Sequence, residues 1–113
     1  MNKVLLKQLV IRLFGLLFLV NSAYADSNVI NIQIQKGRFS PSEINIAADT
    51  KVQLIIENLD DTPEEFESYD LNREVFINPN SKAYFYIGPL SPGVYKFEGE
   101  FSPQTAQGVV RVK

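Results

Sequence analysis

The residues of this chain that are best suited to chemistry are two pairs of glutamates. Glu65 and Glu67 are separated by one residue, and so are Glu98 and Glu100. Alternate residues of a strand point to the same face, so each pair would present two carboxylates side by side. Carboxylate oxygens are hard ligands that suit ferric iron, manganese, calcium or magnesium better than copper(I) or zinc. The four glutamates are therefore candidate metal ligands, although alternating Glu is also typical of the solvated face of a half-buried sheet.

A second acidic group consists of Asp60, Asp61 and Glu64, which fall in a predicted polar loop. Paired Asp residues in a loop more often hydrogen-bond to the backbone of a turn than bind a metal. We therefore rank these three residues below the four glutamates as candidate metal ligands.

Two residue types that are common in active sites are missing, because the chain has no Cys and no His. Their absence removes thiol catalysis, disulfide bonds, thiolate metal sites and the commonest general base. Ser102 and Thr105 have no obvious partner base, so neither hydroxyl is expected to act as a nucleophile. We predict that the protein is not an enzyme.

The first 25 residues have the composition of a secretory signal peptide. A positive start, an apolar run and a small-residue motif follow one another: Lys3, Lys7 and Arg12, then residues 13–20, then Ala-Tyr-Ala at 23–25. The alternative, a transmembrane anchor, would need an apolar run of roughly 20 residues. We expect cleavage after Ala25, a periplasmic location, and a mature domain at residues 26–113 with no membrane span of its own.

The predicted mature domain is acidic. All 13 acidic residues but only 8 of the 11 basic residues follow position 25, which gives residues 26–113 a formal charge of −5. An acidic surface disfavours nucleic acid and anionic lipid as partners, and it is compatible with cations or with a basic protein surface.

Apolar and polar residues alternate along most of this domain, which is typical of half-buried strands. Gly, Pro, Asn and Asp separate the alternating segments, and no segment has a convincing helical pattern. The pattern predicts an all-β antiparallel sandwich with Greek-key connections. It would contain about seven strands, at residues 29–35, 44–46, 52–58, 65–67, 83–87, 95–101 and 109–112. Residues 69–73 are predicted to form an irregular or helical turn, and Phe101 is predicted to share the face of Phe97.

The sequence resembles the cupredoxin superfamily in three places. A Pro-Gly-x-Tyr-x-Phe strand begins at Pro92 and is followed by a β-branched strand at residues 109–112. Asn58 with the segment that begins at Pro63 is similar to the region of the first copper ligand in that superfamily, and the Gly-x-Phe-x-Pro pattern that begins at Gly37 fits as well. The resemblance implies a cupredoxin-like Greek-key β-sandwich.

The same resemblance implies that the blue-copper ligands are lost. The two histidines correspond to Glu64 and Ser102, the cysteine to Gly99, and the methionine to Ala106. A type 1 copper site needs a thiolate and two imidazoles. We therefore expect no type 1 copper and no electron transfer through such a centre.

The segments at residues 63–67 and 98–101 resemble one branch of the superfamily, the cupredoxin-like proteins that accompany periplasmic iron-uptake systems. In that branch the Glu-Phe-Glu motif is associated with iron binding, so the resemblance implies iron as a possible cargo. It also implies that the two glutamate-bearing strands are neighbours, which would gather Glu65, Glu67, Glu98 and Glu100 on one patch. Lys96 shares the face of Glu98 and could offset the repulsion among them.

Three functions follow from these observations. The first is an accessory protein of an iron-transport system, with a membrane iron permease or another periplasmic iron-uptake protein as its partner. The alternative is a metal-free interaction module that docks on a permease or partner protein through the apolar rim of the former copper end. A ferrous oxidase ranks third, because the chain alone supplies no redox centre.

Overall fold

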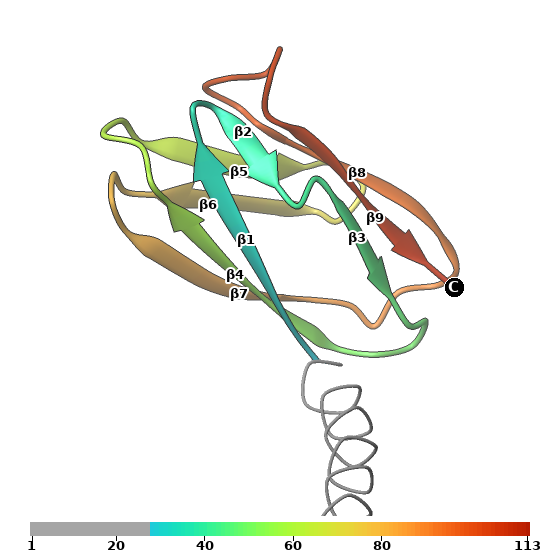
Figure 1. Ribbon diagram of the computed structural model, residues 1–113. Helices are drawn as coiled ribbons and strands as arrows, with labels where there is room; N and C mark the ends of the chain where they lie inside the picture. Colours follow the sequence, from blue (N-terminus) through green and yellow to red (C-terminus); the bar gives the residue numbers. More distant parts are fainter. Residues whose placement is uncertain (1–27) are drawn as a thin grey trace, which may run out of the picture.

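The protein folds as two β-sheets packed face to face (Figure 1). The computed structural model describes residues 28–113, and the predicted signal peptide at residues 1–25 lies outside the described residues. These residues contain nine strands and no helix, so the prediction of an all-β sandwich is confirmed. Accordingly, none of residues 28–113 forms a helix that could cross a membrane.

The strands are divided between a four-stranded and a five-stranded sheet. The four-stranded sheet has the order β2-β1-β4-β7, with bounds Arg38–Ser40, Val29–Gln35, Val52–Asn58 and Lys82–Ile87. The five-stranded sheet has the order β3-β9-β8-β5-β6, with bounds Glu43–Ile46, Gln107–Val112, Gly93–Gly99, Glu64–Ser68 and Arg73–Ile77. Strands β1 and β4 pair in parallel, as do β3 and β9, and the remaining pairs are antiparallel, so the prediction of an antiparallel sandwich is wrong for these two pairs.

The core lies between the two sheets and follows from the alternation in the sequence. Ile32 and Ile34 of β1 and every second residue of β4 are buried, while their neighbours in the chain are more exposed. Aromatic rings supply much of the facing layer, because Phe66 of β5 stacks on Phe97 of β8 with ring centroids 4.9 Å apart. Fully buried side chains of this size each contribute about 1.5–3 kcal/mol to folding.

Two strands were not predicted from the sequence. Strand β2 has only three residues, and it lies between the Lys36-Gly37 turn and a Pro-containing bend. Strand β6 covers Arg73–Ile77, next to residues 69–73, which were predicted as an irregular or helical turn. Residues 69–72 do form a turn, so that prediction is confirmed except at Arg73. Strand β6 was missed because it is a half-exposed edge strand that has only one fully buried residue, Ile77.

The predicted strand at residues 95–101 is too long. Strand β8 ends at Gly99, and the chain then enters a turn that contains Glu100 and Phe101. Phe101 therefore leaves the inward face of Phe97, and it is 52% exposed. Its ring packs instead against Phe76 of β6, with centroids 6.3 Å apart.

Candidate functional site

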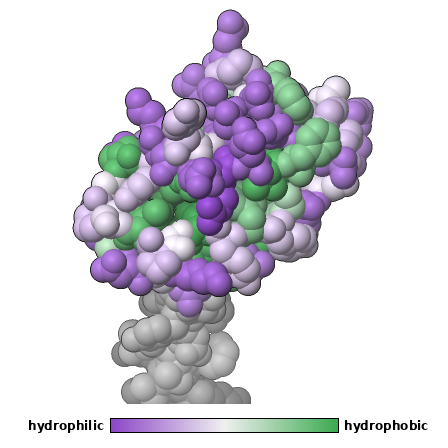
Figure 2. Space-filling view, turned by 180° about the vertical axis from the view of Figure 1, so that it is seen from behind, coloured by the Kyte–Doolittle hydropathy of each residue, from purple (hydrophilic) through white to green (hydrophobic). Residues whose placement is uncertain are grey.

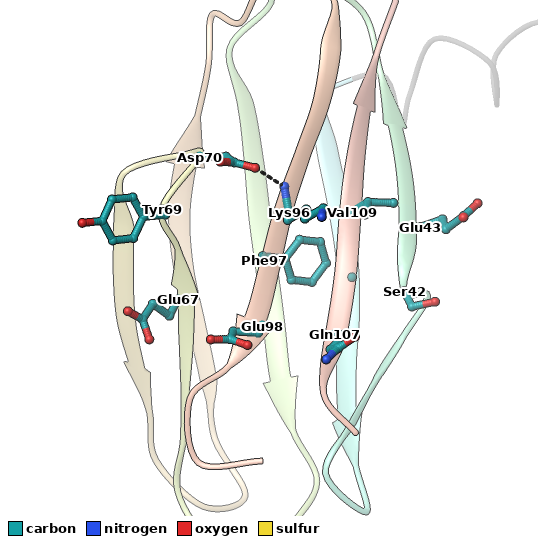
Figure 3. A pocket seen from close by; sticks show the side chains of 11 residues that line it. Ser42, Glu43, Glu67, Tyr69, Asp70, Lys96, Phe97, Glu98, Gln107 and Val109 are labelled. Carbon is teal, nitrogen blue, oxygen red and sulfur yellow. Dashed lines mark hydrogen bonds between the residues drawn. The ribbon is translucent and has the colours of Figure 1, made fainter. Parts of the chain in front are cut away.

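The four predicted glutamates lie together on the outer surface of the five-stranded sheet. Strands β5 and β8 are direct neighbours, and Glu67 is opposite Glu98 in their register. The backbone N–H of Glu100 donates a 2.9 Å hydrogen bond to the carbonyl of Glu65, so the pairing continues past the end of β8. In Figure 3 the carboxylates of Glu67 and Glu98 lie side by side.

A fifth carboxylate, Glu74, joins this group from β6, where it is opposite Glu67. Sequence reasoning missed it because strand β6 was not predicted. The signal was the alternation in Arg73-Glu-Val-Phe-Ile77 before the turn at Asn78-Pro79. We call Glu65, Glu67, Glu74, Glu98 and Glu100 the acidic face.

The pKa values of two glutamates of the acidic face, Glu65 and Glu67, are raised by their surroundings. Partial burial raises the pKa of Glu65, and the negative charge of Glu100, a side-chain hydrogen bond with Glu100 and the charges of Glu74 and Glu67 raise it further. Partial burial also raises the pKa of Glu67, and the charges of Glu100, Glu74 and Glu98 add to that shift. The carboxylates therefore repel one another, and a cation among them would relieve the repulsion.

No basic side chain neutralises the acidic face at ion-pair distance. Within residues 28–113 the only ion pair joins Arg111 and Glu43, at 3.3 Å. Lys96, which shares the face of Glu98, makes no ion pair there, so the predicted compensation is not formed. In the same part of the chain, no three Asp or Glu side chains are close enough together to form a ready-made metal site. A cation would therefore have to draw the side chains inward or keep part of its own hydration.

Glu64 lies on the opposite side of β5 from the acidic face. It was predicted in a loop with Asp60 and Asp61, but it is the first residue of β5 and is 3% exposed. Its Oε1 accepts hydrogen bonds from the backbone N–H groups of Glu65 and Phe101, both at 2.9 Å. The carboxylate thus joins the start of β5 to the turn after β8.

The positions predicted to correspond to copper ligands, Glu64, Gly99, Ser102 and Ala106, lie close together. A Cβ atom placed on Gly99 would be 2.7 Å from the Cβ of Ala106 and 2.8 Å from the Cδ of Glu64. The backbone N–H of Ser102 donates a 3.1 Å hydrogen bond to the carbonyl of Gly99. These residues offer one carboxylate and no thiolate or imidazole, and the space that a cysteine would need is filled. The donor set does not fit type 1 copper.

The two aspartates of the second acidic group bind other parts of the chain. The Asp60 carboxylate accepts hydrogen bonds from the backbone N–H groups of Lys36 (2.7 Å) and Gly37 (3.0 Å), in the turn between β1 and β2. Asp61 accepts a 3.1 Å hydrogen bond from the side-chain amide of Asn80. Asp60 therefore caps a turn, as loop aspartates commonly do.

A groove of about 630 Å³ lies beside the acidic face (Figure 3). Glu67 and Glu98 border it, Tyr69 stands at its rim, and Glu43 and Val109 lie on its far side. Figure 2 shows the molecule from behind relative to Figure 1, and this side exposes both strongly hydrophilic and hydrophobic residues.

The sequence matches the family described as "Cupredoxin-like domain" over residues 8–112. It is 42% identical over 83 residues to the uncharacterized protein RP394 of Rickettsia prowazekii (strain Madrid E). That match covers 74% of this chain and 66% of the relative, so about a third of the relative lies outside it.

Solved structures of copper proteins share the fold. The metal-binding domain of the Cu(I)-exporting ATPase CopA of Streptococcus pneumoniae D39 is similar with a TM-score of 0.64 and 17% identity, over 75% of this chain and 84% of that one. Auracyanin A, a blue copper protein of Chloroflexus aurantiacus, is similar with a TM-score of 0.64 and 12% identity, over 75% of this chain and 98% of that one. At these identities the likeness is one of fold alone.

Proposed function

Because this chain belongs to the cupredoxin-like domain family but lacks the ligands of type 1 copper, we propose that it binds a hard cation, iron, through its acidic face. In this proposal it is a periplasmic accessory protein that binds iron, or hands it over, for a transport system. Its partner is a membrane iron permease or another periplasmic iron-uptake protein. The observation that carries the proposal is the convergence of Glu65, Glu67, Glu98 and Glu100 on two neighbouring strands.

Several properties of the acidic face support cation binding. Carboxylates that raise one another's pKa gain from a positive charge among them, and hard oxygen ligands suit iron better than copper(I). The choice of iron over manganese or calcium rests on the resemblance of the Glu-Phe-Glu segment to iron-uptake proteins. Exposed ligands with incomplete coordination favour weak, reversible binding, which suits handing the ion to a partner.

The test is calorimetric titration of the protein with chelated ferric iron, manganese and copper. The Glu65→Gln/Glu67→Gln variant removes two carboxylates of the acidic face and should abolish the heat of iron binding. The matched control is Glu43→Gln/Glu57→Gln, which removes the same charge from outside the acidic face and should leave binding unchanged. If the folded protein gives no heat with any metal, the cation site is wrong.

A second candidate is the metal-free interaction module, and one observation favours it. Phe76 and Phe101 are 54% and 52% exposed, and they pack on each other beside the turn that Glu64 holds. Exposed apolar pairs of this kind are typical of protein–protein contacts. This alternative predicts a purified protein without metal. It also predicts a partner complex that survives Glu65→Gln/Glu67→Gln but is lost in Phe76→Ser/Phe101→Ser.

A further inference from the structure

The groove beside the acidic face has carboxylates on two of its sides. It crosses β5, β8 and β9 on the outer side of the five-stranded sheet (Figure 3). Phe97, Gly108 and Val109 contribute to its lining, although the Phe97 ring itself is buried in the core. Glu67 and Glu98 border it on one side and Glu43 on the other.

Tyr69 gives the groove an aromatic rim. It follows β5 directly and is 95% exposed, so its ring is available to a ligand. A second hollow, of about 610 Å³, lies beside the same tyrosine, and its lining includes Glu67 and Glu74 as well as the basic Arg73. Tyr69 therefore stands between two hollows, and each of them has carboxylates in its lining.

We infer that this groove docks a basic segment of a partner protein, with an Arg or Lys side chain lying along Tyr69. Arg and Lys have apolar stems and cationic ends, so the stem fits against the exposed Tyr69 ring and the charge fits among Glu67, Asp70 and Glu98. The ring of an exposed tyrosine also attracts a cation directly. The overall charge of −5 on residues 26–113 steers a basic partner toward the domain.

Charge complementarity favours this occupant over a second copy of the chain. The groove has several carboxylates and one basic side chain, Lys96, in its lining, so an equally acidic copy would be repelled. Lys96 also gives the inference a signature, because its ammonium group opposes a basic ligand in this groove. Removing that charge should strengthen binding.

The docking proposal and the iron proposal can be tested with different residues. Tyr69 and Asp70 line the groove but lie outside the acidic face, whereas Glu65 and Glu100 belong to the acidic face but not to the groove. The probe is a fluorescent hexa-arginine peptide, titrated into the protein at physiological ionic strength and followed by anisotropy. A hexa-glutamate peptide should not bind.

Substitutions at Tyr69 and Lys96 should change the affinity for the hexa-arginine peptide in opposite directions. Tyr69→Ala should weaken binding of the hexa-arginine peptide about three-fold, since a cation–aromatic contact at an exposed site contributes about 0.5–1 kcal/mol. Lys96→Gln should tighten it. Tyr84→Ala is the matched control, because Tyr84 is also an exposed tyrosine (59%) but lies on β7 of the other sheet, and it should change nothing. Amide chemical shifts of the labelled protein should move around Tyr69 and along β8 and β9.

Three results would overturn the inference. One is that Tyr69→Ala and Tyr84→Ala weaken peptide binding equally, or that neither weakens it, while the amide chemical-shift changes spread over all acidic residues. Another is concentration-dependent dimerisation that Tyr69→Ala abolishes, which would make a second copy the occupant. The third is loss of peptide binding in Glu65→Gln/Glu100→Gln with full binding in Tyr69→Ala, which would place the peptide on the acidic face alone. The iron proposal has a separate test: it is wrong if the Glu65→Gln/Glu100→Gln variant still binds iron as the unmodified protein does.

Discussion

At the scale of residues, Glu64 and Glu65 are neighbours in the chain with opposite environments. The alternation that buries Phe66 also turns Glu64 and Ser68 inward, while Glu65 and Glu67 face outward. The outward pair could be predicted from its spacing around Phe66. The buried role of Glu64 could not, because it depends on β5 starting one residue earlier and on a backbone N–H from the distant Phe101.

Replacing Glu64 with alanine should destabilise the fold strongly. The change leaves two backbone N–H groups without their acceptor and opens a gap beside Gly99 and Ala106. We expect the free energy of unfolding to fall by about 2–4 kcal/mol, because hydrogen bonds to a charged group and buried volume are both lost. Urea denaturation followed by tyrosine fluorescence would measure this.

Two further variants serve as controls for the expected loss of stability in Glu64→Ala. Glu64→Gln retains an acceptor oxygen and should cost less than Glu64→Ala. Glu43→Ala, at an exposed ion pair, should change stability by less than about 1 kcal/mol. Equal stability of Glu64→Ala and the unmodified protein would show that the buried carboxylate does not hold this end together.

The acidic face should make stability fall as pH rises. The pKa values of Glu65 and Glu67 are raised above the ordinary 4.5, so the folded state holds protons that the unfolded chain releases. Stability is therefore lost as pH rises from 4.5 through the raised values. Glu65→Gln/Glu67→Gln should raise the melting temperature of the metal-free protein near neutral pH and have little effect below pH 4.5. A variant that melts lower than the unmodified protein at neutral pH would contradict the repulsion.

At the scale of elements, long alternating segments were predictable and short or half-exposed ones were not. Strand β1 alternates apolar and polar residues from Ile30 to Gln35, and β4 is a seven-residue apolar-rich segment that is buried at every second position. Strand β2 is three residues long, and β6 buries only Ile77 fully, so local pattern alone could not separate either from a turn. The end of β8 was missed for a related reason, since Phe101 continues the pattern while the backbone has already turned away.

Strands β8 and β9 fit together through one glycine. Gly108 is opposite Phe97, and a Cβ atom on Gly108 would be 2.2 Å from the Cζ of that ring and 2.7 Å from the carbonyl oxygen of Ser42. Gly108→Ala should therefore lower the free energy of unfolding by about 2 kcal/mol through overpacking. A double-mutant cycle would test the cause: adding Phe97→Leu should recover part of the loss, so that the double variant is more stable than the sum of the single changes predicts. If the two changes in the free energy of unfolding were simply additive, the strain in Gly108→Ala would not come from contact with Phe97.

At the scale of the whole molecule, hydrogen bonds join the loops that follow β1, β4 and β8 to one another. Asp60 binds the backbone of Lys36 and Gly37, and the Thr105 hydroxyl donates a 2.6 Å hydrogen bond to the Gly37 carbonyl. The side-chain amide of Asn58 donates to the Thr62 carbonyl at 2.9 Å. The cupredoxin-like fold could be predicted from the turn-and-strand motifs, but this network could not, because its partners are far apart in sequence.

This network predicts that the fold does not depend on a metal. The melting temperature in an excess of a strong chelator should equal that in metal-free buffer. Iron added in excess should raise it by mass action if the acidic face binds iron. Differential scanning calorimetry would measure both. Unfolding or a lower melting temperature in chelator would mean that a metal holds the fold, contrary to the role assigned here to Glu64 and Asp60.

The bridge that Glu64 forms between β5 and the turn after β8 bears on how this end of the protein assembles. Here the group that joins β5 to the turn after β8 is encoded in the chain itself. This end of the molecule is therefore joined by a group that the polypeptide supplies as soon as it has folded.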